Sequence, residues 1–131
     1  MSQENVEVVE RLYSMASMAL ALDVFASDIE WDLTNFFGWT EKPVYHGHEG
    51  VREMMRDWVG SFHSWDVTLE RAEPSGDEVL AVVRERAYVK GISQPLVRRN
   101  AARFTFRGDV IVRARFYSEV SEALKAVGLE E

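Results

Sequence analysis

The sequence contains no cysteine, which excludes disulfides, a thiolate nucleophile and a zinc finger. It also has no apolar run that approaches the roughly 18 residues of a membrane span. The chain opens on the acidic segment Met1-Ser2-Gln3-Glu4, whereas a cleaved secretion signal opens on basic residues. We therefore expect a cytoplasmic protein that makes no contact with a membrane.

Basic residues are too few to balance the acidic ones, and the formal net charge is −7. This charge argues against nucleic acid as the main partner. The charges are unevenly distributed, because residues 1–50 carry two basic and nine acidic side chains, whereas residues 84–115 carry nine basic and two acidic ones. Such a dipolar chain is suited to self-association or to an anionic ligand, although a solvated arginine face on a sheet is the simpler interpretation.

The spacing of apolar residues predicts helices in the first half of the chain. The first helix carries a stripe at three- and four-residue steps, formed by Val6, Val9, Tyr13, Ala16 and Leu20. A second, short helix is expected through Val24 and Phe25. The clearest helix begins near Glu49, with an apolar face of Val51, Met54, Met55, Trp58, Val59 and Phe62. With 131 residues, the chain is expected to form one domain, 1–131.

Alternating apolar and polar residues predict strands over 29–33, 65–73, 79–89, 96–106 and 110–117. Residues 34–47 contain two glycines and a proline and are expected to form a loop. A closing helix over 121–127 should end at Gly128, because glycine is the usual residue just after a helix. Helices followed by an antiparallel meander predict the α+β class.

Successive side chains of a strand point to opposite faces, so the residues of the last three predicted strands divide into two sets. The apolar set is Val83, Glu85, Ala87 and Val89, then Asn100, Ala102, Phe104 and Phe106, then Val110, Val112, Ala114 and Phe116. This set should face the helices, and its small residues should leave room for a cavity. The opposite set is rich in arginine and is a candidate contact surface for a second subunit.

Glu85 and Asn100 interrupt the apolar set. A buried carboxylate needs a partner or a raised pKa, and such an environment tunes acid–base groups at functional sites. Glu85 is therefore a catalytic candidate. The alternative is that Glu85 lies near a strand end or pairs with an arginine.

Four segments, in order along the chain, carry a family resemblance. They are Val9-Glu10-Arg11-Leu12-Tyr13, Asp28-Ile29-Glu30-Trp31-Asp32, the run from Tyr45 to Glu53, and the hairpin from Arg107 to Tyr117 with the tail Gly128-Leu129. Together they resemble the SnoaL-like branch of the nuclear transport factor two superfamily, which includes many actinobacterial proteins. The resemblance implies a cone-shaped fold, in which a strongly curved antiparallel or mixed sheet packs against about three N-terminal helices. It also implies an apolar pocket inside the cone. Members of the family are commonly dimeric.

The same resemblance places Asp32 where ketosteroid isomerase holds its proton-shuttling carboxylate, with Glu30 two residues earlier on the same strand face. The two oxyanion donors of that isomerase fall at Leu12 and Ala102, so a steroid isomerase of that mechanism is not expected. A carboxylate in an apolar cavity still abstracts a proton next to a carbonyl when a donor stabilises the oxyanion. We expect Asn100 or Tyr13 to be that donor.

The leading hypothesis is therefore a pocket protein for a small apolar molecule, acting as a cofactor-free isomerase or cyclase. Its catalytic candidates are Asp32, Glu85, Asn100 and Tyr13, and its ligand-binding candidates are Glu30, Met55, Trp58, Ala102, Phe104, Ala114 and Phe116. The alternative is a non-catalytic ligand-binding or dimerisation module of the same fold. A homodimer is expected, without cofactor or metal. His46 and His48 are interpreted as a turn before a helix, and Trp39 as a loop anchor or a lid.

Overall fold

The computed structural model describes residues 2–14, 22–36, 42–60 and 62–129. The helices are α1 (Ser2–Ser14), α2 (Gly47–Gly60) and α3 (Val120–Ala126). The strands are β1 (Phe25–Asn35), β2 (Val44–His46), β3 (Phe62–Ser75), β4 (Glu78–Val89), β5 (Leu96–Arg107) and β6 (Val110–Tyr117). The α+β class predicted from the sequence is confirmed.

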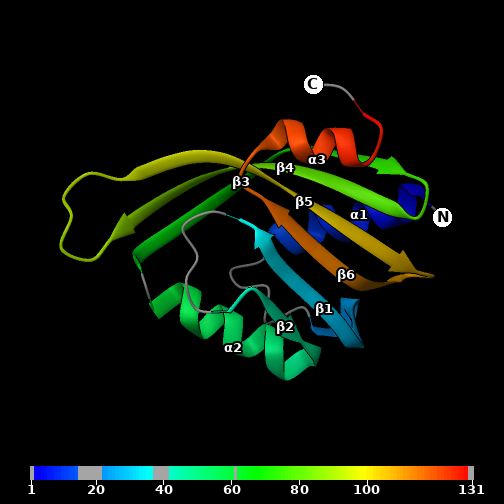
Figure 1. Cartoon of the computed structure of the whole chain (residues 1–131), viewed down its shortest axis with the longest axis horizontal. Coiled ribbons are helices and arrows are strands. Elements are labelled where there is room, and N and C mark those ends of the chain that lie inside the picture. The colour runs from blue at the N-terminus through cyan, green and yellow to red at the C-terminus, as the bar shows by residue number, and fades with distance from the viewer. Residues whose placement is uncertain (1, 15–21, 37–41, 61, 130–131) are drawn as a thin grey trace.

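The six strands form one mixed sheet in the order β2-β1-β6-β5-β4-β3. Neighbours are antiparallel except for β1 and β6, which run parallel. Within the described residues β2 and β3 are the two edges, so the curved sheet is open and not a closed barrel. Helices α1 and α2 lie against one face and α3 against the other (Figure 1).

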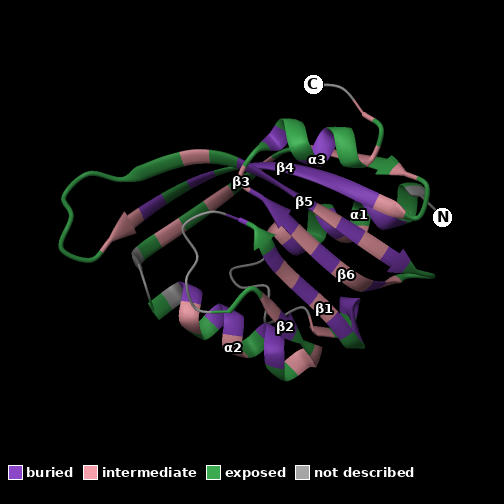
Figure 2. Cartoon of the chain, in the orientation of Figure 1, coloured by how far each residue is buried: buried purple, intermediate pink, exposed green. Residues whose placement is uncertain are grey.

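Burial follows the two faces of the sheet, as the banding of β1, β5 and β6 in Figure 2 shows. The inner face joins α1 and α2 in the main hydrophobic core, which includes Val9, Leu12, Phe104 and Ile111. A second, smaller core forms on the outer face under α3. It contains Leu80, Val82, Ala101, Tyr117, Val120, Ala123 and Leu124. Because both cores lie on one sheet, the chain's two ends are held by the same scaffold.

The helix boundaries differ from the sequence prediction in two places and agree in another. Phe62, expected on the apolar face of the helix that begins near Glu49, is the first residue of β3, because its backbone pairs with Val89 of β4 after α2 ends at Gly60. Val24 lies in a short 3₁₀ turn and Phe25 begins β1, so the predicted helix through these residues is wrong. Tertiary pairing explains the difference, because Phe25 is aligned with Ile111 of β6. At the other end α3 stops as expected, since Gly128 adopts a φ of 78° and the amide of Leu129 bonds the carbonyl of Leu124 at 2.8 Å.

The segment 34–47, expected to be a loop, contains β2. Its residue Tyr45 pairs with Trp31 across the antiparallel β1–β2 ladder. β2 has only three residues, Val44, Tyr45 and His46, which are too few to show a clear alternation of apolar and polar side chains. The strand therefore depends on β1 for its hydrogen bonds and leaves little signal in the sequence.

A β-bulge changes the side-chain parity of β6. Thr105 is aligned with Arg113 but the next residue, Phe106, is aligned with Ile111. The extra residue turns Ile111 into the core and leaves Val112 half-buried, whereas Ala114 remains inside. The prediction that Val110 and Val112 face inward is therefore wrong.

Several arginines of the outer face pair with acidic residues of a neighbouring strand or of the next strand but one. Glu70 accepts hydrogen bonds from Arg84 and Arg99, both at 2.9 Å. Glu78 receives both ends of the Arg103 guanidinium at 2.9 Å. These pairs distribute the positive charge of residues 84–115 over an ion-pair network.

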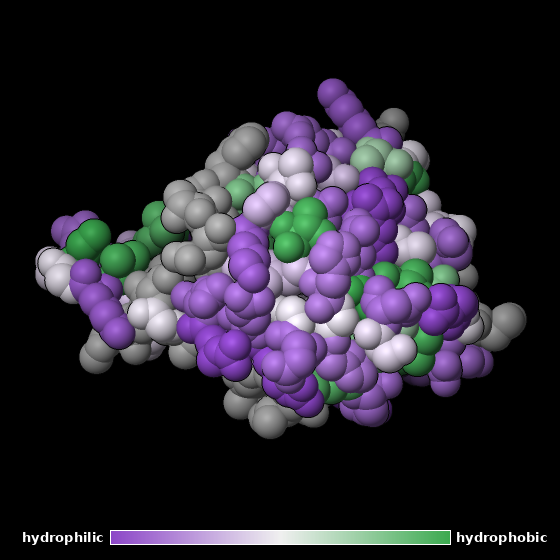
Figure 3. Space-filling model, turned by 60° about the horizontal axis from the view of Figure 1, so that its bottom comes forward, coloured by the Kyte–Doolittle hydropathy of each residue, from purple (hydrophilic) through white to green (hydrophobic). Residues whose placement is uncertain are grey.

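The β4–β5 hairpin extends well beyond the body of the protein (Figure 1). The exposed large hydrophobic residues in the described part of the chain are Ile92, Leu96 and Val97 of this hairpin. Seen from below, the protein surface is largely hydrophilic, with hydrophobic residues near the end of the arm (Figure 3). No helix within the described residues has the length and apolar character of a membrane span.

Candidate functional site

A pocket opens between α1, α2 and the inner face of the sheet. Its cavity volume is about 60 Å³. The lining residues are Tyr13, Trp31, Leu33, Phe36, Met54, Met55, Trp58, Trp65, Val67, Val83, Asn100 and Phe116. Six of these twelve side chains are aromatic and none is charged, so the described wall suits a neutral, mostly apolar molecule.

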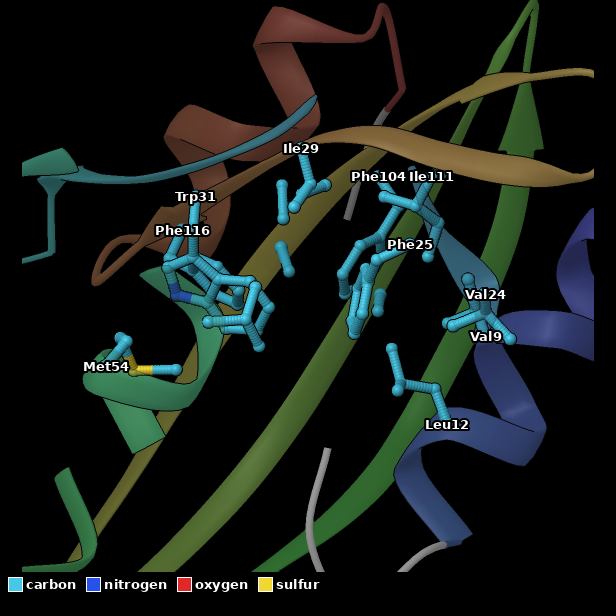
Figure 4. Close-up of a cluster of buried hydrophobic side chains, with 14 of the residues drawn as sticks. Val9, Leu12, Val24, Phe25, Ile29, Trp31, Met54, Phe104, Ile111 and Phe116 are labelled. Carbon is cyan, nitrogen blue, oxygen red and sulfur yellow. The ribbon is translucent and has the colours of Figure 1, made fainter. Parts of the chain in front are cut away.

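The aromatic side chains of the wall pack against one another. The rings of Trp31 and Phe116 lie 4.7 Å apart, on the neighbouring strands β1 and β6. Figure 4 shows these two rings side by side, with Met54 of α2 pointing toward them. On the far side Trp58 meets Phe36 and Trp65 edge to face, with ring centroids 5.6 and 5.9 Å apart. These contacts make the wall a packed surface whose shape is preset.

One end of the pocket is polar because Glu85 lies directly behind its wall. Glu85 is 4% exposed and shares the inner face of β4 with Val83. Its Oε1 accepts hydrogen bonds from Asn100 Nδ2 at 2.6 Å and from Arg98 Nε at 2.8 Å. Its Oε2 accepts one from Trp65 Nε1 at 2.8 Å. Asn100 and Trp65 thus separate the carboxylate from the pocket, and Glu85 orients both of them.

Tyr13 of α1 closes the same end of the pocket. Burial, together with the negative charge of Glu85, raises the pKa of the Tyr13 hydroxyl above its ordinary value. Its ring also meets Phe104 edge to face at 6.1 Å. The hydroxyl therefore stays protonated at neutral pH and is available as a donor.

Arg98 belongs to the site, although the sequence analysis did not single it out. Its guanidinium bonds Glu85 and lies over the ring of Phe36, 4.6 Å from the centroid. The sequence does contain a signal for Arg98, because it lies two residues before Asn100 and therefore on the same face of the strand. The observed pair also fits the alternative in which Glu85 is partnered by an arginine.

The structure places Asp32 and Glu30 outside the pocket, on the outer face of β1. Asp32 Oδ1 accepts the backbone amide of Thr34 at 2.8 Å, and Oδ2 lies 3.8 Å from Arg113. Glu30 accepts a hydrogen bond from the same arginine at 2.8 Å. The inner face of this strand is occupied by Trp31 and Leu33. The expectation that Asp32 and Glu30 face the cavity is therefore wrong.

The other expected site residues divide into two groups. Those that line the pocket are Tyr13, Met55, Trp58, Asn100 and Phe116. Those that lie in the main core without lining it are Ala102, Phe104 and Ala114, each at most 1% exposed. The aromatic ring of Phe104 fills the space that the neighbouring alanines leave. The expected cavity is thus displaced toward α2.

His48 and His46 lie at the start of α2 and the end of β2. A ring nitrogen of His48 lies 2.8 Å from the carbonyl oxygen of Phe25, which joins α2 to β1. His46 is exposed. Within the described residues no three histidine or acidic side chains are grouped as metal ligands would be. Trp39 lies outside the described residues.

Comparison with solved structures identifies several proteins of the same fold. A Catenulispora acidiphila protein with a ketosteroid isomerase-like fold, crystallised with trimethylamine, is 19% identical with a TM-score of 0.73, covering 99% of this chain and 96% of its own. A Jannaschia protein that has been proposed to be a SnoaL-like polyketide cyclase is 15% identical with a TM-score of 0.74, covering 99% and 95%. TerC, co-crystallised with polyporic acid, is 15% identical with a TM-score of 0.74, covering 95% and 97%.

A comparison with curated protein sequences found no match. The model of the SnoaL-like domain family matches residues 8–114, which include α2, all six strands except the end of β6, and most of α1. This match extends over most of the chain. The chain belongs to the SnoaL-like domain family.

Proposed function

We propose that the protein binds a small, neutral and mostly apolar organic molecule in this pocket. The observation that carries the proposal is the composition of the wall, where eleven of the twelve lining side chains are hydrophobic or aromatic and the twelfth is Asn100. Burial of apolar ligand surface supplies the affinity, and a few polar groups fix the orientation. Tyr13 and Asn100 are the polar groups at the Glu85 end.

The size of the cavity limits the part of the ligand that is enclosed. A volume of about 60 Å³ accommodates a fragment of a few heavy atoms. Two proteins of the same fold were crystallised with organic molecules, namely trimethylamine and polyporic acid. These ligands differ widely in size, which supports a general capacity for small molecules and leaves the ligand of this chain to experiment.

Binding can be tested with two probes of matched shape, cyclopentane and cyclopentanone. We expect both to shift the methyl resonances of ¹³C-labelled Met54 and Met55 in a saturable manner. Val67→Phe should fill the pocket and abolish these shifts, because Val67 lines it. Thr68→Phe is the matched control, since this neighbour is exposed on the other strand face. Saturable binding that survives Val67→Phe would place the ligand elsewhere.

Acid–base catalysis is a second candidate, favoured by the charged Glu85 close to the protonated Tyr13. Because Asn100 and Trp65 separate Glu85 from the pocket, the reaction would require one of these side chains to move aside. The carboxylate would then take a proton from the carbon next to a carbonyl and return it to another carbon. Tyr13 would donate a hydrogen bond to the enolate oxygen in between. These two proton transfers consume no cofactor.

The proton transfer would be visible as exchange of the α-hydrogens of cyclopentanone for deuterium in heavy water. Protein-dependent exchange that Glu85→Gln removes would support catalysis. Asp32→Asn should leave the exchange rate unchanged, because Asp32 lies on the outer face. Exchange at the buffer rate would leave binding as the function.

A further inference from the structure

Trp31 carries a hydrogen-bond donor that the described part of the protein does not use. Its side chain is 2% exposed and lines the pocket. Its Nε1 is buried and has no acceptor within hydrogen-bond distance among the described residues. A buried donor without a partner is costly, and native structures rarely leave one unused without a reason.

Trp65 lines the same pocket and shows the contrasting arrangement. Its Nε1 donates to Glu85 Oε2 at 2.8 Å, so its hydrogen-bonding capacity is consumed within the protein. Asn100 is likewise committed through Nδ2 to Glu85 Oε1 at 2.6 Å. Trp31 is held in place by Phe25 and Phe116, which contact its ring but cannot accept its N–H as an oxygen would. Its donor is therefore fixed in position and has no acceptor in the part of the chain that the structure describes.

We propose that the indole N–H of Trp31 is a specificity-determining donor of the pocket and that it selects ligands with a neutral oxygen acceptor, such as a ketone or ester carbonyl. The indole nitrogen is only a donor, so it cannot recognise an ammonium group by hydrogen bonding. No basic side chain lines the described wall, and Arg98 is paired with Glu85, so a carboxylate ligand would lack a counter-ion. A neutral acceptor satisfies Trp31 without burying a charge.

The inference rests on the proposed function and is tested with the same two probes. In ¹⁵N-labelled protein, cyclopentanone should shift the Trp31 indole proton downfield, whereas cyclopentane should leave it nearly unchanged. The Trp65 indole proton is the internal control, because it is already bonded to Glu85. Trp31→Phe, which also identifies the resonance by its loss, should weaken cyclopentanone binding about three- to tenfold. Cyclopentane binding should change less than about twofold, because the aromatic ring is retained.

Trp65→Phe serves as the matched variant. It alters the same wall, so it should affect the two probes equally and leave their affinity ratio unchanged. The inference is overturned if Trp31→Phe also leaves that ratio unchanged, or if both probes shift the Trp31 proton equally. If neither probe binds the wild-type protein, the proposed function fails and this inference fails with it. Binding without discrimination at Trp31 removes this inference alone.

Discussion

Asn100 Nδ2 lies 2.6 Å from Glu85 Oε1, across neighbouring strands and behind the wall of an otherwise apolar pocket. The two residues are the buried polar interruptions of the inner sheet face among the described residues, and Asn100 donates to the carboxylate. Arg98 and Trp65 supply the remaining donors to the carboxylate. This cluster gives the pocket a polar end without exposing a charge to it.

Replacing Asn100, the donor of this pair, should strongly destabilise the protein. In Asn100→Asp two carboxylates would face each other, and we expect a loss of about 2–4 kcal/mol in the free energy of unfolding at pH 7. Repulsion between the two carboxylates favours protonation of one of them in the native state. The pKa of that carboxyl therefore rises above its value in the unfolded chain. The loss should consequently shrink as the pH falls through that raised pKa. Urea unfolding from pH 7 to pH 5 measures this, with the exposed Asn35→Asp as the control.

The ion pair between Glu85 and Arg98 should couple more strongly than the surface pairs. A double-mutant cycle with Glu85→Gln and Arg98→Met should give a coupling of about 1–2 kcal/mol, moderated because the Arg98 side chain is 28% exposed. The cycle for Glu70 and Arg84 is the control. That pair is more exposed, and its coupling should be smaller. Equal coupling in the two cycles would argue against a special role for the buried carboxylate.

Glu70 should make stability depend on pH in the acidic range. Hydrogen bonds from Arg99 and Arg84 hold the pKa of Glu70 below its ordinary value of 4.5. A lowered acid pKa stabilises the native state above the unfolded pKa, and this contribution is lost as the pH falls through the folded pKa. Glu70→Gln should therefore lower stability at pH 7 and have a diminishing effect below about pH 4. Glu10→Gln, at an exposed position of α1, should show no such trend.

Asp32→Asn should leave the pocket intact. The substituted side chain retains an oxygen that can accept the amide of Thr34, and only the 3.8 Å pair with Arg113 is lost. We expect a change of less than about 1 kcal/mol in stability and an unchanged affinity for cyclopentanone. Calorimetry measures the change in stability, and titration of the Met54 and Met55 methyl resonances measures the affinity. A large loss of affinity with unchanged stability would return Asp32 to the binding site.

Two glycines of α2 should respond in opposite directions to alanine. A Cβ at Gly50 would meet the backbone carbon of Tyr45 at 3.1 Å, whereas a Cβ at Gly60 has nothing within 4 Å. Gly50→Ala should destabilise by about 1–3 kcal/mol, because the β2–α2 contact must open. Gly60→Ala should stabilise by up to about 1 kcal/mol, because alanine favours the helix. Thermal unfolding of the two variants gives the comparison.

The homodimer implied by the resemblance, the absence of a cofactor and the cytoplasmic location stay predictions. Sedimentation of the purified protein measures the first. The arginine face offers a surface for it, although α3 covers part of that face and acidic partners already pair with the arginines.

The sequence by itself determined the class of fold, the inward position of Glu85 and Asn100, and the apolar face of α2. These features depend on periodicity within single elements, which local spacing records directly. The alternation in residues 29–33 also places Trp31 and Asp32 on opposite faces, as the structure does, whereas the family resemblance assigns Asp32 to the pocket.

Only the tertiary structure decided which side of β1 faces the cavity, how the bulge turns β6, and that Arg98 neutralises Glu85. Each depends on pairing between distant segments, such as the parallel alignment of Trp31 with Ala114. A one-residue shift in such a pairing exchanges the buried and exposed side chains of a strand. That the indole donor of Trp31 has no acceptor among the described residues has the same origin, because whether a polar atom finds a partner depends on every element that packs around it.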